Sequence, residues 1–215
     1  MMTRFLRPLA ALALVALLPA CAAISALGDA AEPPDVYDLR PAQLGFAASG
    51  ATGRDLVIEE PNARGALDTD RILIRPNPLQ AQYLPNARWS DSTPAMVQTQ
   101  LLRAFEDAGA LRYVGRRPLG LSGDFALISE LTDFQAELQP DGRSAMVRIR
   151  LSARLVREDD ASIRGARVFE ATAAAASTQT LDLVAAFDAA AGQLVPELTA
   201  WALQAMGVGL RQAVP

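Results

Sequence analysis

The chain has 215 residues, 51% apolar and 20% charged, a composition typical of a globular protein with one core. Its 20 basic residues are all arginine, and it has 24 acidic residues, one cysteine and no histidine. The missing lysine and histidine exclude a Schiff base, a P-loop lysine and an imidazole base. The single cysteine excludes an internal disulfide and, without histidine, an ordinary zinc site.

Residues 1–20 are typical of a lipoprotein signal peptide. Arg4 and Arg7 precede an apolar run at residues 9–18, which is about half the length needed to cross a bilayer. The run ends in Leu18-Pro19-Ala20-Cys21, which resembles a bacterial lipobox. We therefore expect cleavage before Cys21 and acylation of its thiol, so that the chain carries a covalent lipid and no other cofactor or metal. The alternative is an ordinary cleavable signal with an incidental cysteine.

The charge of the processed chain bears on its partners. Removing the signal removes two arginines and no acids, leaving 18 arginines against 24 acids and a net charge of −6. Nucleic acid is not expected as a partner, because such proteins carry a basic footprint.

Residues 21–54 are rich in Ala, Asp, Glu and Pro, and they predict a lipidated tether with a short strand near residues 36–39. We place the folded domain at residues 55–210. Short strands are predicted at 56–58 and 72–75, with a third piece within residues 82–89. A helix follows, with Thr93 as N-cap, Pro94 at the first helical position and Gly109 just past the end.

Three longer strands are predicted in the second half, at residues 125–132, 146–155 and 164–175. The turns Pro140-Asp-Gly142 and Glu158-Asp-Asp160 separate them and favour an antiparallel meander. Apolar residues at three- and four-residue steps predict a final helix over 184–205, which Pro196 should kink or divide. The predicted fold class is a single α+β domain, with an antiparallel or mixed sheet and two main helices packed on one face.

Two groups of residues are candidates for a partner interface. Arg148, Arg150 and Arg154 share one face of a strand, where they can contact an acidic partner or anionic lipid head groups. The alternative is a solvated face on which they pair with Glu130, Glu137 and Glu170 across strands. The second group contains aromatic and arginine residues that are typical of interface anchors, with core packing as the alternative for the aromatics: Tyr83, Arg88, Trp89 and Asp91.

Carboxylates are the general acids or bases that the composition leaves available, for example Glu59, Glu60, Asp68 and Asp70. They lie in a turn-rich stretch where solvation explains them, so we do not expect an enzyme.

Several short segments, in order along the chain, resemble the ABC-type transport auxiliary lipoproteins, a PqiC-like group. After the lipobox cysteine, the resemblance rests on these segments: Tyr37-Asp-Leu39, Leu67-Asp-Thr-Asp-Arg-Ile72, Tyr83, Asn86-Ala-Arg-Trp89, Asp91, Val97-Gln-Thr-Gln-Leu-Leu102, Ala104-Phe-Glu106, Gly123-Asp-Phe-Ala-Leu127, Glu130-Leu131, Phe134 and Val184-Ala-Ala-Phe-Asp188. The sequence departs mildly at Pro19 and at Asn86, where a glycine is common.

The resemblance implies a periplasm-facing envelope lipoprotein of a diderm bacterium. Such a protein serves beside an ABC transporter permease and ATPase complex and an MCE-domain protein, which move phospholipid or other hydrophobic molecules between membranes. It is a non-catalytic accessory subunit, and an oligomer is compatible with this role. Ala22, not Asp, follows Cys21, which favours the outer membrane.

Two other functions remain open and make different structural predictions. A periplasmic lipid-binding carrier lipoprotein requires an apolar cavity between helices and sheet that is large enough for a lipid, whereas a docking module is packed solid. A carboxylate enzyme requires a cleft with two convergent acids.

Overall fold

The computed structural model describes residues 33–120 and 123–212. The signal peptide and Cys21 lie outside the described residues.

Three long antiparallel strands dominate the main sheet: β7 (Phe125–Leu138), β8 (Ala145–Arg157) and β9 (Ser162–Ala175). The other edge of β7 is shared by two shorter strands that run parallel to it, β3 (Asp55–Ile58) and β4 (Arg71–Asn77). The sheet continues from β4 to β5 (Gln80–Trp89) and β1 (Asp35–Tyr37), and from β3 to β6 (Tyr113–Gly115). The sheet is therefore mixed, and with eight strands it is larger than the sequence predicts.

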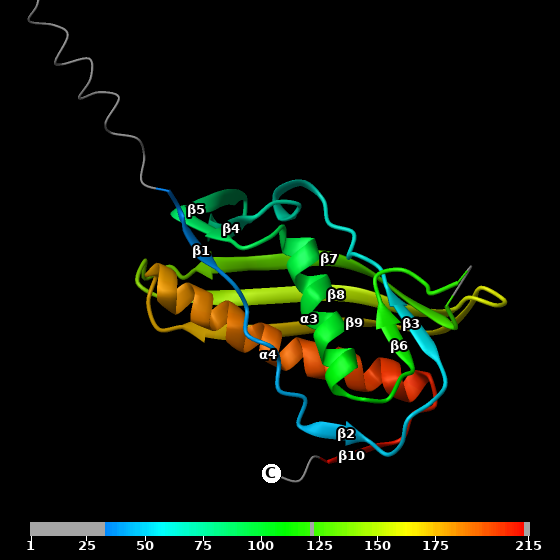
Figure 1. The fold of residues 1–215 in the computed structure, drawn as a ribbon. Coiled ribbons are helices and arrows are strands. Elements are labelled where there is room, and N and C mark those ends of the chain that lie inside the picture. The colour runs from blue at the N-terminus through cyan, green and yellow to red at the C-terminus, as the bar shows by residue number, and fades with distance from the viewer. Residues whose placement is uncertain (1–32, 121–122, 213–215) are drawn as a thin grey trace, which may run out of the picture. The chain divides into compact units, whose positions relative to one another are not determined.

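Two helices, α3 (Thr93–Asp107) and α4 (Thr180–Ala205), cover the same face of this sheet (Figure 1). A short 3-10 turn, η1 (Gly65–Leu67), precedes β4. This arrangement confirms the predicted α+β class, the order of strands and helices, and the two helices on one face.

One predicted helix end needs correction. The N-cap of α3 is Ser92, whose hydroxyl accepts a hydrogen bond from the Ala95 N–H, and Thr93 is already helical. Of the two effects expected of Pro196, a kink or a division of the last helix, the division does not occur, since α4 is one continuous helix through this residue. Leu194 and Leu198, on either side of the proline, are both buried, so packing of this face against the sheet outweighs the lost backbone hydrogen bond.

An aromatic cluster joins the layers. Phe134 of β7 stacks on Phe187 of α4 with ring centroids 5.0 Å apart, and the Trp89 ring of β5 meets both edge-on, at 5.8 Å and 5.2 Å. All three side chains are fully or almost fully buried. The cluster fixes the position of the shorter strands relative to both α4 and the long meander.

The packed domain begins near Asp35 and not at residue 55. The strand expected near residues 36–39 lies at Asp35–Tyr37, where it runs parallel to β5, and β2 (Phe46–Ala48) pairs with β10 (Leu210–Gln212). Between them Leu39 is buried, and its carbonyl accepts a hydrogen bond from the Gln100 side chain. These distant partners hold the segment, although its composition resembles a linker.

Among residues 33–120 and 123–212, no helix combines the length and the hydropathy that crossing a membrane requires.

Candidate functional site

Helices α3 and α4 leave one face of the sheet uncovered. This face carries one of the two interfaces predicted from the sequence. We call it the open face, and define it as the outward positions of β7, β8 and β9. Arg148, Arg150 and Arg154 all lie on it, because the inward positions of β8, such as Ile149 and Leu151, are buried against the helices. The register aligns each arginine with one outward residue on each neighbouring strand.

One half of the open face is an ionic network. The Arg148 guanidinium donates to Glu137 at 3.1 Å and to Glu170, and Arg150 lies 3.7 Å from Glu170. The hydrogen bond with Glu137, together with both negative charges, raises the pKa of Arg148 above its ordinary value. Arg148 and Arg150 thus have carboxylate partners within the domain, as expected for a solvated sheet face.

The other half of the open face differs in charge and in polarity. Arg154 is exposed, and among the residues that the structure describes no carboxylate lies within ion-pair distance of it. Glu130, an expected partner of the arginine row, forms no ion pair within this part of the chain. Large aliphatic side chains lie on the same half and are well exposed: Ile128 (37%), Val168 (49%) and Ile163 (61%).

Sequence reasoning missed these aliphatic residues as part of a site. Ile128 stands at a position of β7 whose neighbours on the same face, Glu130 and Thr132, are polar. An isoleucine on the polar side of an alternating strand was the available signal.

The second candidate region, Tyr83 to Asp91, is partly exposed, with Ala87 and Trp89 as its buried residues. Trp89 is completely buried in the aromatic cluster, so its predicted role as a surface anchor is wrong and core packing explains it. The Tyr83 hydroxyl donates a hydrogen bond to the Ala66 carbonyl at 3.3 Å. The Arg71 guanidinium lies over the Tyr83 ring, 4.1 Å from the ring centroid.

Arg88 and Asp91 are the members of this region that keep polar groups at the surface. Arg88 pairs with Asp70 at 3.1 Å, and the Asp91 carboxylate accepts the Ser92 N–H at 2.7 Å. Both are therefore engaged in contacts within the domain.

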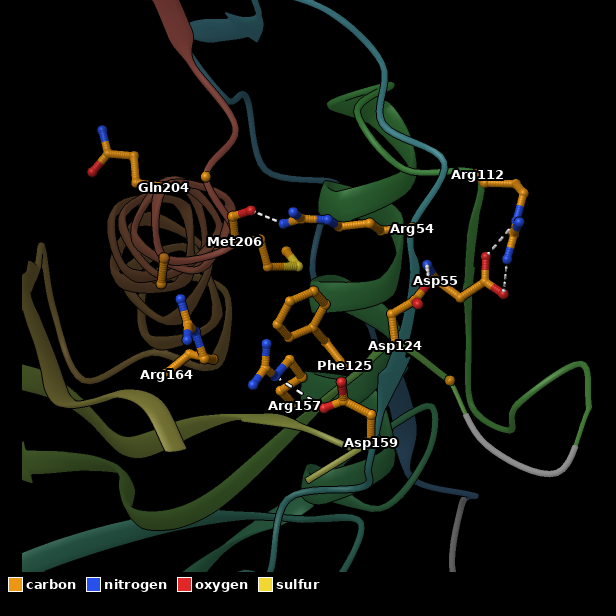
Figure 2. A pocket seen from close by; sticks show the side chains of 13 residues that line it. Arg54, Asp55, Arg112, Asp124, Phe125, Arg157, Asp159, Arg164, Gln204 and Met206 are labelled. Carbon is orange, nitrogen blue, oxygen red and sulfur yellow. Dashed lines mark hydrogen bonds and ion pairs between the residues drawn. The ribbon is translucent and has the colours of Figure 1, made fainter. Parts of the chain in front are cut away.

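A polar cleft of about 690 Å³ lies where β3, the start of β7 and the end of α4 meet (Figure 2). Arg112 donates two hydrogen bonds to Asp55, at 2.8 Å and 2.7 Å, and this contact holds the pKa of Asp55 below its ordinary value. The Arg54 guanidinium donates to the Met206 carbonyl at the end of α4, and Arg157 lies 2.9 Å from Asp159.

This cleft does not have the electrostatics of an acid–base site. A general acid needs a carboxyl group whose pKa is raised, whereas Asp55 is ionised and paired. Of the acids considered from the sequence, Asp70 pairs with Arg88, while Glu59, Glu60 and Asp68 are exposed on loops. The described residues also contain no cluster of acidic or cysteine side chains that could hold a metal.

The size of the cavity between helices and sheet distinguishes a lipid carrier from a docking module. The cavity there, lined by Leu39, Phe134 and Leu194 among others, measures about 10 Å³. Ligand pockets typically measure about 300–1,000 Å³, so this interior leaves no room for an acyl chain in the described conformation.

Comparisons with known proteins agree with this fold. The crystal structure of a Xanthomonas campestris protein superimposes with a TM-score of 0.72 at 25% identity, covering 80% of this chain and 97% of that one. Another crystal structure, of an uncharacterized protein, shares the fold with a TM-score of 0.60 at 15% identity, covering 79% of this chain and 99% of that one.

A curated relative, an uncharacterized protein of Bradyrhizobium diazoefficiens, is 34% identical over 178 residues. The match covers 79% of this chain and 45% of the relative, so the chain spans less than half of that protein's length.

The match to a family model covers most of the domain. Residues 37–199, most of the folded domain, match the family described as the ABC-type transport auxiliary lipoprotein component. The chain therefore belongs to this family of envelope-associated lipoproteins, which serve as auxiliary components of ABC-type transport.

Proposed function

We propose that this protein is the non-catalytic accessory subunit of an ABC-type system that moves lipids, phospholipids among them, between the membranes of a diderm envelope. A lipid on Cys21 anchors it to a membrane, and the absence of Asp after Cys21 favours the outer one. In this role it docks an MCE-domain protein, which works with the permease and ATPase.

The observation that carries this proposal is the contrast between a filled interior and an uncovered sheet face. The cavity between helices and sheet is about 10 Å³, whereas one side of three long strands has no covering element among the described residues. A domain whose described residues fill the space between helices and sheet, and leave a large face available, is suited to binding another protein and less suited to enclosing a lipid.

The acyl anchor has separate support. The lipobox-like Leu18-Pro19-Ala20-Cys21 belongs to the sequence, and the matched family is one of lipoproteins. Several acyl chains on one cysteine give stable membrane attachment, because each buried methylene contributes about 0.8 kcal/mol.

The test uses the full-length chain, tagged at its C-terminus and expressed in the bacterium that encodes it. Membranes are treated with a mild crosslinker, and the purified protein is analysed by mass spectrometry for partners and for bound phospholipid. We expect an MCE-domain protein in the crosslinked product and a membrane-bound tagged chain. The matched Cys21→Ser variant should leave the membrane fraction.

Recovery of the chain with stoichiometric phospholipid and no MCE-domain protein would contradict the docking role and favour the carrier.

A further inference from the structure

We infer that the docking surface is the half of the open face that surrounds Arg154, and that it binds a protein segment presenting a carboxylate between aliphatic side chains. This inference rests on the proposed function and specifies where, and by which chemistry, the partner is held. We call the surface the Arg154 patch and define it by these residues: Ile128, Arg154, Val156, Ile163, Ala166 and Val168.

The strand register makes the patch continuous. Arg154 lies directly between Ile128 of β7 and Ala166 of β9, and Val156 lies beside Ile163. Val168 occupies the next outward position of β9 after Ala166. Three adjacent strands span about 10 Å, so Ile128 and Ala166 flank the arginine, while Ser152 and Glu130 lie in the neighbouring row beside Val168.

The charges of the face single out Arg154. The neighbouring Arg148, Arg150 and Arg157 each have a carboxylate of the same domain within 4 Å. Arg154 has none among the described residues, and neither has Arg64. Both line a hollow of about 160 Å³ together with Glu130, which lies beyond ion-pair distance of either arginine. An unpaired guanidinium among aliphatic side chains is the combination that a partner's carboxylate stabilises once water is excluded.

Strand propensity does not require aliphatic side chains at these positions, because threonine is also β-branched and favours strands. The other half of this face carries threonine at Thr172. Ile163 and Val168 are instead 61% and 49% exposed beside the unpaired arginine. Single exposed aliphatic residues are ordinary, but several close together mark an interaction site, and arginine is among the residues enriched at the centres of interfaces.

A protein partner fits this surface better than a membrane. Electrostatic binding to anionic lipid takes clusters of about four to eight basic side chains. The patch has Arg154, with Arg64 nearby, on a chain whose net charge after removal of the signal is −6. Aliphatic contact around one or two carboxylate pairs is the recognition that this geometry supports.

The first experiment places a photo-reactive amino acid at position 168 of the full-length lipoprotein in its own host. We expect a crosslink to the MCE-domain protein on illumination. The same residue at position 181 is the control, because Leu181 is 70% exposed but belongs to α4, outside the patch. A product at 168 consisting only of a second copy of this chain, or only of phospholipid, would overturn the inference.

The second experiment measures binding of the purified MCE-domain protein to the full-length lipoprotein in detergent. Arg154→Glu should weaken the affinity about tenfold or more, because it removes the pair and adds a repulsive charge. Arg103→Glu makes the same change of charge on an exposed position of α3 and should leave the affinity unchanged. Thermal unfolding of both variants reports whether they are folded.

The two levels of the proposal fail differently. If the unmodified lipoprotein does not bind the MCE-domain protein, the proposed function falls and the inference falls with it. If it binds, and folded Arg154→Glu binds as tightly as Arg103→Glu, the docking surface lies elsewhere and the Arg154 patch is wrong.

Discussion

At the scale of single residues, Asn86 shows how backbone conformation constrains the sequence. Its φ is +53°, in the left-handed region, and it lies in β5 where the pairing with β4 shifts register. Glycine adopts this conformation without steric cost, and asparagine tolerates it better than most residues. This accounts for an asparagine at a position where the resembling family commonly has glycine.

The corresponding prediction compares two substitutions at this position. Asn86→Gly should leave the free energy of unfolding within about 0.5 kcal/mol of the original, whereas Asn86→Val should lower it by about 1–2 kcal/mol, because a β-branched side chain clashes with the backbone at positive φ. Urea denaturation measures both. Equal stability of the two variants would show that the bulge relaxes to another conformation.

Trp89 shows a limit of sequence-based prediction at this scale. The segment Asn86-Ala-Arg-Trp89 places an aromatic beside an arginine, a combination that fits an interface as well as a core. Trp89 is a core residue because it contacts Phe134 and Phe187, which are distant in the sequence. Arg154 differs from Arg148 for the same reason. Arg148 reaches Glu137 and Glu170 on the neighbouring strands, whereas Ile128 and Ala166 lie opposite Arg154.

At the scale of elements, local patterns predicted the meander well and the N-terminal segment poorly. Strands β7, β8 and β9 alternate with period two between turn residues, so their sequence alone specifies them. Residues 35–54 have no such pattern. They are held by Asp188, whose carboxylate accepts the Arg40 backbone N–H at 2.8 Å and its Nε at 2.9 Å, and by the hydrogen bond from Gln100 to Leu39.

We predict that Asp188→Ala loosens this segment while leaving the sheet intact. Amide hydrogen exchange should become severalfold faster at residues 39–48, because the carboxylate that holds Arg40 is gone, and should not change in β7 and β8. Mass spectrometry of peptides after exchange measures both regions.

The matched control is Glu197→Ala, which removes the ion pair with Arg167 of β9 from the same helix. Faster exchange at residues 39–48 in both variants would mean that α4 itself is destabilised, and that the Arg40 contact is not the cause.

At the scale of the whole molecule, stability depends on a core shared by all the main elements. The rings of Trp89, Phe134 and Phe187 belong to β5, β7 and α4, so one cluster joins the shorter strands, the meander and the helical layer. A two-layer architecture of this kind followed from the order of strands and helices in the sequence. The parallel pairing of β3 and β4 with one edge of β7 did not, because no local signal encodes it.

We expect Trp89→Ala to lower the free energy of unfolding by about 3–5 kcal/mol, since it opens a cavity among these rings. Trp89→Phe should lower the free energy of unfolding by clearly less. It keeps an aromatic ring, and the indole N–H that it removes has no hydrogen-bond partner among the described residues. Thermal or urea unfolding compares the two. If Trp89→Phe lowered the free energy of unfolding as much as Trp89→Ala, the exact fit of the indole, and not contact between aromatic rings, would determine the stability of the cluster.

The parallel pairing of β1 with β5 also bears on mechanical load. Asp35 aligns with Ala87 and Tyr37 with Trp89, so tension applied to the chain ahead of Asp35 along the strand would shear these backbone hydrogen bonds together. Because β1 has only three residues, the contacts at Leu39 and Arg40 would bear the force next. With the lipid anchor proposed above, pulling on the chain ahead of Asp35 would therefore be resisted by this short strand and by the Arg40–Asp188 contact behind it.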